Sequence, residues 1–112
     1  MGKGRFLGEF EQVVLLAVHR LGDDAYGVTV RQEITARIGR QVSIGAVYAT
    51  VNRLSDKGYL ESYGTDPVPI RGGRARRNFR LTAAGAAALR ATRNMLGTMW
   101  EGVDLDRDPS AV

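Results

Sequence analysis

The chain has 112 residues, a formal net charge of +4 and a sequence pI of about 10.0, which predicts one domain and favours an anionic partner over a cationic one. It contains no cysteine, and this excludes disulfides, thiolate nucleophiles and cysteine metal sites. No apolar run approaches the roughly 20 residues of a membrane span, and no signal peptide is visible, so we expect a soluble, cytoplasmic protein without a membrane partner.

The first two predicted helices carry apolar residues at helical spacing. In the first helix, Glu9 and Glu11 occupy the first turn, where the helix dipole favours acids. The second helix is predicted from about Ala25 to Ile38, and Gly39 ends it. The expected buried face consists of Leu7, Phe10, Val14, Ala17, Val18 and Leu21 in the first helix, and of Val30, Ile34 and Ile38 in the second.

The third predicted helix begins after Ser43, a favourable N-cap, and ends at Gly58. Its core-facing arc consists of Ile44, Val47, Tyr48, Val51 and Leu54. Its opposite face consists of Ala46, Ala49, Arg53 and Lys57, flanked by Gly45 and Thr50. This outward face is small, polar and basic, and Asp56 is its one acid. Such a face lets the helix backbone approach another surface closely.

Two short strands are predicted next, from Tyr59 to Tyr63 and from Asn78 to Leu81. The long loop before the second strand carries an arginine cluster that no acid interrupts, formed by Arg71, Arg74, Arg76 and Arg77. Thr82 then caps a final helix whose residues repeat at alternating four- and three-residue spacing, as in a heptad seam. The seam requires a partner helix and consists of Gly85, Leu89, Thr92, Leu96, Met99 and Val103.

The order of these elements predicts a mostly α (α+β) winged helix. It would have a three-helix helix-turn-helix core, a two-stranded β-wing and a C-terminal dimerisation helix. Residues 1–82 would form the DNA-binding domain, residues 83–103 the dimerisation helix, and residues 104–112 an acidic tail expected to be disordered. The charge agrees with this division, because 13 of the 16 basic residues and 8 of the 12 acidic residues precede Ala83.

Several segments, taken in order, resemble the PadR family of bacterial transcription regulators. They are Phe6–Val18, Ala25-Tyr-Gly27, Ser43–Tyr48, Thr50, Arg53-Leu54, Lys57-Gly58, Arg76-Arg77 and Leu81–Gly85. The chain is similar to the short subfamily, in which one C-terminal helix replaces a longer dimerisation domain. The resemblance implies a homodimeric repressor that binds an inverted-repeat operator and is released by a small molecule. The Pro-containing wing loop from Thr65 to Arg74 departs from the family.

We expect double-stranded DNA to meet the third helix in a groove and the wing along the backbone. Asn52 and Arg53 are the mid-helix candidates for bidentate base contacts. The wing arginines are expected to contact backbone phosphates, and the alternative is that they form a solvated charge cluster. Tyr48 fits core packing and a phosphate hydrogen bond equally well. The predicted DNA-binding residues are Ser43, Gly45, Ala46, Tyr48, Ala49, Thr50, Arg53, Lys57, Arg71, Arg74, Arg76 and Arg77.

The last helix is predicted to pair two copies of the chain, partly by packing against the partner's first helix. The expected interface residues are Leu89, Thr92, Leu96, Met99, Trp100 and Val103. Trp100 fits simple packing in this interface. The family resemblance also implies a pocket for a small aromatic or apolar effector, formed by Met95, Met99 and Trp100.

Other function classes fit the sequence less well. A winged helix that serves as a protein–protein interaction scaffold predicts acids or large apolar groups on the outward face of the third helix, and only Asp56 is of this kind. An enzyme would require a catalytic set, but His19 is the single histidine and no Walker-type loop is present. Double-stranded RNA would present too narrow a groove for the third helix. We therefore expect no enzymatic activity, cofactor or metal.

Overall fold

The computed structural model describes residues 6–64 and 77–106, so the tail from residue 107 and the loop 65–76 lie outside it. Three helices, an antiparallel two-stranded hairpin and a last helix follow one another, which confirms the predicted fold class. The elements are α1 (Glu9–Leu21), the 3₁₀ turn η1 (Gly22–Asp24), α2 (Gly27–Ile38), α3 (Ile44–Asp56), β1 (Leu60–Gly64), β2 (Arg77–Leu81) and α4 (Ala83–Trp100).

The hydrophobic core lies among α1, α2, α3 and the hairpin. Phe79 of β2 is fully buried in it, so the hairpin is anchored to the helices by a large side chain. The strand is also tied to the start of α2, because the Phe79 N–H donates to the Ala25 carbonyl at 2.9 Å. The buried amide of Asn78 donates to the Asp23 carbonyl at 2.7 Å. The fully buried helical side chains include Val14, Leu15, Val18, Val30, Ile34, Val47, Val51 and Leu54.

The predicted helix caps are confirmed. The Ser43 hydroxyl accepts a hydrogen bond from the Ala46 N–H at 3.0 Å and begins α3. The Thr82 hydroxyl accepts from the Gly85 N–H at 3.0 Å and begins α4. After α3, Gly58 has a φ of 80°, a left-handed conformation that suits glycine and turns the chain into β1.

The end of α2 at Ile38 is confirmed, but its start and the burial of Ile38 differ from the sequence prediction. The helix begins at Gly27, because Tyr26 is its extended N-cap and Ala25 hydrogen-bonds to β2. At the other end, Ile38 is 53% exposed, although its spacing predicted burial. Ile38 is the last helical residue, and Gly39 turns the chain in a left-handed conformation with φ of 67°. The side chain therefore lies at the edge of the contact between α1 and α2.

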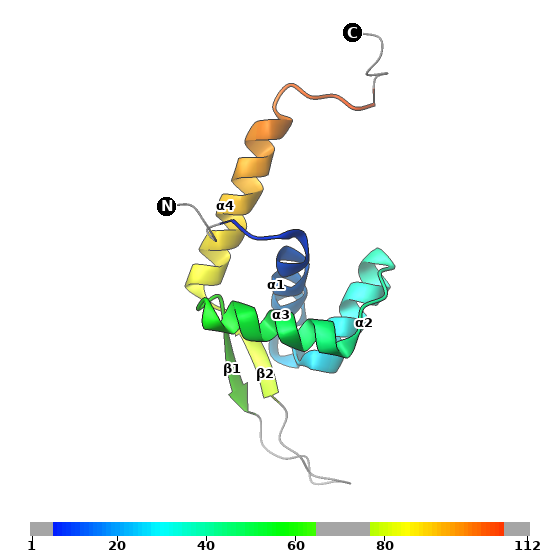
Figure 1. Ribbon diagram of the computed structural model, residues 1–112, viewed down its shortest axis with the longest axis vertical. Coiled ribbons are helices and arrows are strands. Elements are labelled where there is room, and N and C mark those ends of the chain that lie inside the picture. The colour runs from blue at the N-terminus through cyan, green and yellow to red at the C-terminus, as the bar shows by residue number, and fades with distance from the viewer. Residues whose placement is uncertain (1–5, 65–76, 107–112) are drawn as a thin grey trace.

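Figure 1 shows α3 lying across α1, with the hairpin beside the end of α3 and α4 projecting away from the other elements. The start of α4 lies close to β1: a Cβ on Gly85 would collide with the Tyr59 carbonyl oxygen. The helix ends at Trp100 rather than at the predicted Val103. Gly102 follows with φ of 76° and turns the chain.

Candidate nucleic-acid interface

The outward face of α3 is exposed and built from small residues. Gly45, Ala46 and Ala49 are all exposed, as is Ser43 at the N-cap. The side chains of these residues are small and extend little beyond the helix backbone. The arrangement permits close contact along the N-terminal half of the helix, as the sequence predicted.

Thr50 is a correction to the predicted surface. Its side chain is only 3% exposed, so it is not available on the outward face. The reason is helical spacing: Thr50 lies three residues after Val47 and four before Leu54, and both of these face the core. The Thr50 hydroxyl instead accepts a long hydrogen bond of 3.4 Å from Nη2 of Arg53.

Tyr48 packs against the start of α2. A Cβ on Gly27 would collide with the Tyr48 hydroxyl and ring, so the missing side chain at Gly27 leaves the space in which Tyr48 packs. Tyr48 nevertheless stays exposed along part of its surface. The ring therefore has the predicted packing role, and the hydroxyl lies beside the first residue of α2 at the edge of the outward face. Its contact with a phosphate stays a prediction.

The two cations at the C-terminal end of α3 share one acid from α1. Nζ of Lys57 lies 3.0 Å from Oε2 of Glu11, and Nε of Arg53 lies 3.4 Å from the same oxygen. The other carboxylate oxygen, Oε1, accepts from the Gly8 N–H at 3.0 Å and caps α1. Only 11% of the Glu11 side chain is exposed, whereas the two cations reach solvent.

The pKa of Glu11 follows from these contacts. Burial alone would raise the pKa of its carboxyl. The hydrogen bond from the Gly8 N–H and the two neighbouring cations outweigh burial, so the pKa lies below its ordinary value. Sequence reasoning placed Glu11 in the first turn of α1 but missed its ionic role. No local signal could have shown it, because its partners are 42 and 46 residues away.

The wing reaches α3 through Arg77. Nη1 of Arg77 donates to Oδ1 of Asn52 at 3.3 Å, and the guanidinium lies 5.2 Å from the centroid of the Phe79 ring. The structure thereby brings one predicted wing arginine beside a predicted base-reading residue of α3. The remaining wing arginines, Arg71, Arg74 and Arg76, lie outside the described residues.

The predicted seam of α4 divides into two halves. Thr92 is 1% exposed, and its hydroxyl accepts the Leu7 N–H at 3.0 Å, so it belongs to the core of its own chain and not to an exposed interface. Leu89 is half-buried and packs against the same core. The second half is different: its seam residues Leu96 and Val103 are exposed, Met99 is 72% exposed, and Trp100 beside the seam is exposed as well.

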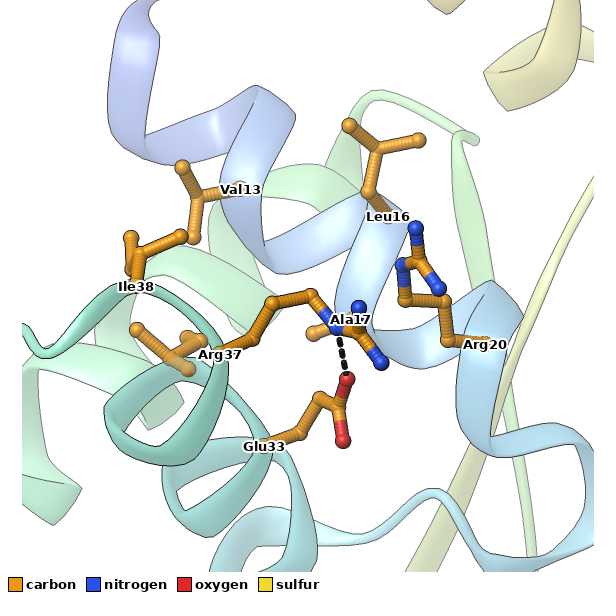
Figure 2. Close-up of a pocket in the computed structure, with 8 residues that line it drawn as sticks. Val13, Leu16, Ala17, Arg20, Glu33, Arg37 and Ile38 are labelled. Carbon is orange, nitrogen blue, oxygen red and sulfur yellow. Dashed lines mark hydrogen bonds and ion pairs between the residues drawn. The ribbon is translucent and has the colours of Figure 1, made fainter.

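Two hollows lie beside α1 and share Leu16. The first, between α1 and α2, has a volume of about 180 Å³ and an apolar lining that includes Val13 and Ile38 (Figure 2). Arg37 and Glu33 form an ion pair of 2.6 Å within it. The second hollow lies between α1 and α4 and has a volume of about 480 Å³. Its lining residues are Gln12, Leu16, Leu89, Arg90, Arg93, Leu96, Gly97 and Trp100.

The predicted effector residues are only partly brought together. Trp100 lines the hollow between α1 and α4, but Met95 and Met99 do not. Residues four apart share a face of a helix, so Leu96 and Trp100 line the hollow together, whereas Met95 and Met99 lie on the neighbouring face. Met95 is half-buried, while Met99 faces solvent.

Two further observations concern the described residues alone. Within residues 6–64 and 77–106, no three acidic or histidine side chains gather in a way that could hold a metal ion. Across the same part of the chain, no helix has the length and apolar character needed to cross a membrane.

The helix-turn-helix core, the hairpin that follows its third helix and the exposed cationic face of that helix define a winged helix-turn-helix protein. The sequence matches the transcriptional regulator PadR-like family over residues 14–91, and the chain belongs to this family. Members of this family are transcriptional regulators and not enzymes, which confirms the predicted family and the absence of an enzymatic role.

One relative agrees with this assignment, and two solved structures share the fold of the chain. The chain is 38% identical to the transcriptional regulator Rv3488 of Mycobacterium tuberculosis over 78 aligned residues. The aligned segment covers 70% of this chain and 68% of that protein. It shares its fold with a PadR-like transcription factor from Bacteroides fragilis, with a TM-score of 0.69 and 22% identity. The match covers 82% of this chain and 84% of that one. A PadR family regulator from Eggerthella lenta has a TM-score of 0.65, 22% identity and coverage of 83% and 76%.

Proposed function

We propose that this regulator is a DNA-binding homodimeric repressor that recognises an inverted-repeat operator. The observation that carries the proposal is the outward face of α3. Its N-terminal half is small and exposed, its C-terminal half carries Arg53 and Lys57, and Asn52 in the same half contacts Arg77 of the wing. A thin helix of this kind fits the major groove, and the neighbouring cations fit backbone phosphates.

The partly paired state of these cations supports phosphate binding. Arginine has five N–H donors and lysine has three, and the contacts with Glu11, Thr50 and Asn52 engage only some of them. These contacts restrain the cationic side chains and leave their remaining N–H donors available. A phosphate would therefore meet cations whose conformational freedom is already reduced.

The homodimer is proposed from the second half of α4. Leu96, Met99 and Trp100 there, and Val103 just after the helix, are exposed in the described part of the chain, and an apolar hollow lies between α4 and α1. The α4 helix of a second copy would cover both, and the exposed Leu16 on α1 adds to the same surface. A twofold pair would present two α3 helices to one side of a duplex, roughly 34 Å apart.

Repression would follow from occupancy of a promoter, because a dimer bound across two major grooves excludes polymerase. Release by a small aromatic or apolar effector is proposed from Trp100, which lines the hollow beside α4 and lies where two copies would meet. A ligand that changes the angle between the copies would change the spacing of the two α3 helices.

Selection of bound sequences from a random duplex library tests the proposal. We expect an inverted repeat whose half-sites are about one helical turn, 10 base pairs, apart. Sedimentation of the same protein should give the mass of a dimer. A monomer at micromolar concentration, or a selection that yields no repeated half-site, would reject this function.

The effector is tested separately by the fluorescence of Trp100, which is the one tryptophan of the chain. Planar aromatic compounds are titrated into the dimer bound to the selected duplex. We expect quenching together with loss of bound DNA. Fluorescence that does not change across such compounds leaves Trp100 as an interface residue and removes the effector from the mechanism.

A further inference from the structure

Glu11 is a buried acid that lies behind the two cations of the candidate DNA-binding face. Its carboxylate belongs to α1, Arg53 extends from the last turn of α3, and Lys57 is the C-cap residue of α3. The distances are 3.0 Å to Nζ of Lys57 and 3.4 Å to Nε of Arg53. Since the carboxylate is mostly buried and the cations are more exposed, the acid restrains them from the protein side and leaves their outer side open to a ligand.

The two oxygens of Glu11 have separate tasks. Oε1 accepts the Gly8 N–H and caps α1, while Oε2 accepts from both cations. A glutamine at this position retains an oxygen for the cap but removes the negative charge. The capping role and the ionic role of this residue can therefore be separated by one isosteric substitution.

We propose that Glu11 is a positioning residue for DNA recognition, which holds Arg53 and Lys57 along α3 and withholds part of their charge from non-specific duplex. This inference rests on the proposed DNA-binding function. Non-specific affinity comes from counterions that cations displace from the phosphates. A cation that already has an internal partner contributes less to that term. Matched operator contacts gain from the restrained geometry, so Glu11 raises the ratio of specific to non-specific binding.

The chain offers a closely matched control. Glu9 lies in the same first turn of α1 and forms an ion pair with Arg40 at 2.8 Å, but its side chain is 75% exposed, and Arg40 lies between α2 and α3 rather than on α3. Glu9→Gln and Glu11→Gln remove the same charge from almost the same place. A general change in the electrostatic field would affect both variants equally, whereas positioning of the α3 cations requires Glu11.

The experiment measures the affinity of the wild type and both variants for two duplexes across a range of salt concentrations. One duplex is the sequence selected from the library, and the other is a shuffled duplex of equal length. For Glu11→Gln we expect the ratio of the two affinities to fall about fivefold or more, and the salt slope on the shuffled duplex to steepen by roughly one unit per protomer. Glu9→Gln should keep the wild-type ratio.

A double-variant cycle separates positioning from a structural effect. In a Lys57→Gln background the acid has lost one of its two cations, so adding Glu11→Gln should change the ratio less than it does in the wild type. An effect that is the same in both backgrounds would overturn the inference. Circular dichroism confirms that each variant is folded. If Glu11→Gln does not fold, Glu11→Asp, which draws the carboxylate back by one methylene, should still lower the ratio.

The two proposals fail in different ways. A wild type that binds neither duplex rejects the DNA-binding function itself. A wild type that discriminates between the duplexes, with Glu11→Gln indistinguishable from Glu9→Gln in ratio and slope, rejects only the positioning role of Glu11.

Discussion

The helices α3 and α4 are both amphipathic and both begin at a hydroxyl N-cap, but their apolar residues meet different surroundings. The aliphatic residues on the core-facing side of α3, Val47, Val51 and Leu54, are fully buried in their own chain. In the first turns of α4 the core-facing Gly85 and Ala88 are also buried, whereas Leu96 and Met99 further along are exposed. The apolar side of α3 is covered within one chain, whereas α4 has an exposed apolar surface, which we propose a second copy covers. The outward face of α3 is then free for an anionic ligand.

Two leucines allow this difference to be measured with the same chemical change. Leu54 is fully buried in α3, so Leu54→Ala should lower the free energy of unfolding by about 2–5 kcal/mol through lost burial and a cavity. Urea unfolding followed by circular dichroism measures the change. A decrease in the free energy of unfolding below about 1 kcal/mol would contradict the full burial of the apolar side of α3 within one chain.

Leu96→Ala makes the same change on the exposed half of α4. We expect the dissociation constant of the dimer to rise by about tenfold or more, which corresponds to roughly 1.4 kcal/mol, with helical content unchanged. Analytical ultracentrifugation over a concentration series gives the constant. Thr92→Val is the control one turn earlier: it removes the acceptor of the Leu7 N–H and should cost about 1–3 kcal/mol of stability without weakening the dimer. If Thr92→Val weakened the dimer and Leu96→Ala lowered only the stability, the proposed division of α4 into a buried half and an interface half would be wrong.

The outward side of α3 is tested by the wing arginine that touches it. Arg77→Gln removes a cation beside Asn52, so the slope of log affinity against log salt should become shallower by roughly one unit per half-site. Arg20→Gln removes an exposed arginine at the end of α1, on the hollow between α1 and α2, and should leave the slope unchanged. Equal changes in both variants would show that only net charge matters.

The parts of this fold that depend on neighbours in sequence were predictable. The caps at Ser43 and Thr82 and the stop at Gly58 are local signals, and the order of elements follows from them. The buried stripe of α3 follows equally from helical periodicity. The spacing of apolar residues shows which side of a helix is apolar, but it does not show whether that side packs against the same chain or against another. The seam of α4 is therefore a single pattern in the sequence but has two different environments in the structure.

The errors have a common physical origin in polar and terminal residues. Thr50 and Thr92 were predicted to lie on contact surfaces, yet both are buried, because a threonine fits the core once its hydroxyl has a partner. Ile38 is apolar but exposed, since the helix ends there. The ionic role of Glu11 depends on a contact between α1 and α3, which only the assembled fold defines.

The smallest expected effect concerns the acid that joins α1 to α3. The pKa of Glu11 is lowered in the folded protein relative to its ordinary value of 4.5, so its stabilising contribution is present above that value. As the pH falls through the lower folded-state pKa, protonation removes this contribution. Urea unfolding from neutral pH to about pH 3 should therefore show a steeper loss of stability for the wild type than for Glu11→Gln. Glu9→Gln should follow the wild-type curve, because it leaves the buried carboxylate and both α3 cations in place. Parallel curves for the wild type and Glu11→Gln would mean that the tie between α1 and α3 contributes nothing to folding, and Glu11 would then act on DNA binding alone.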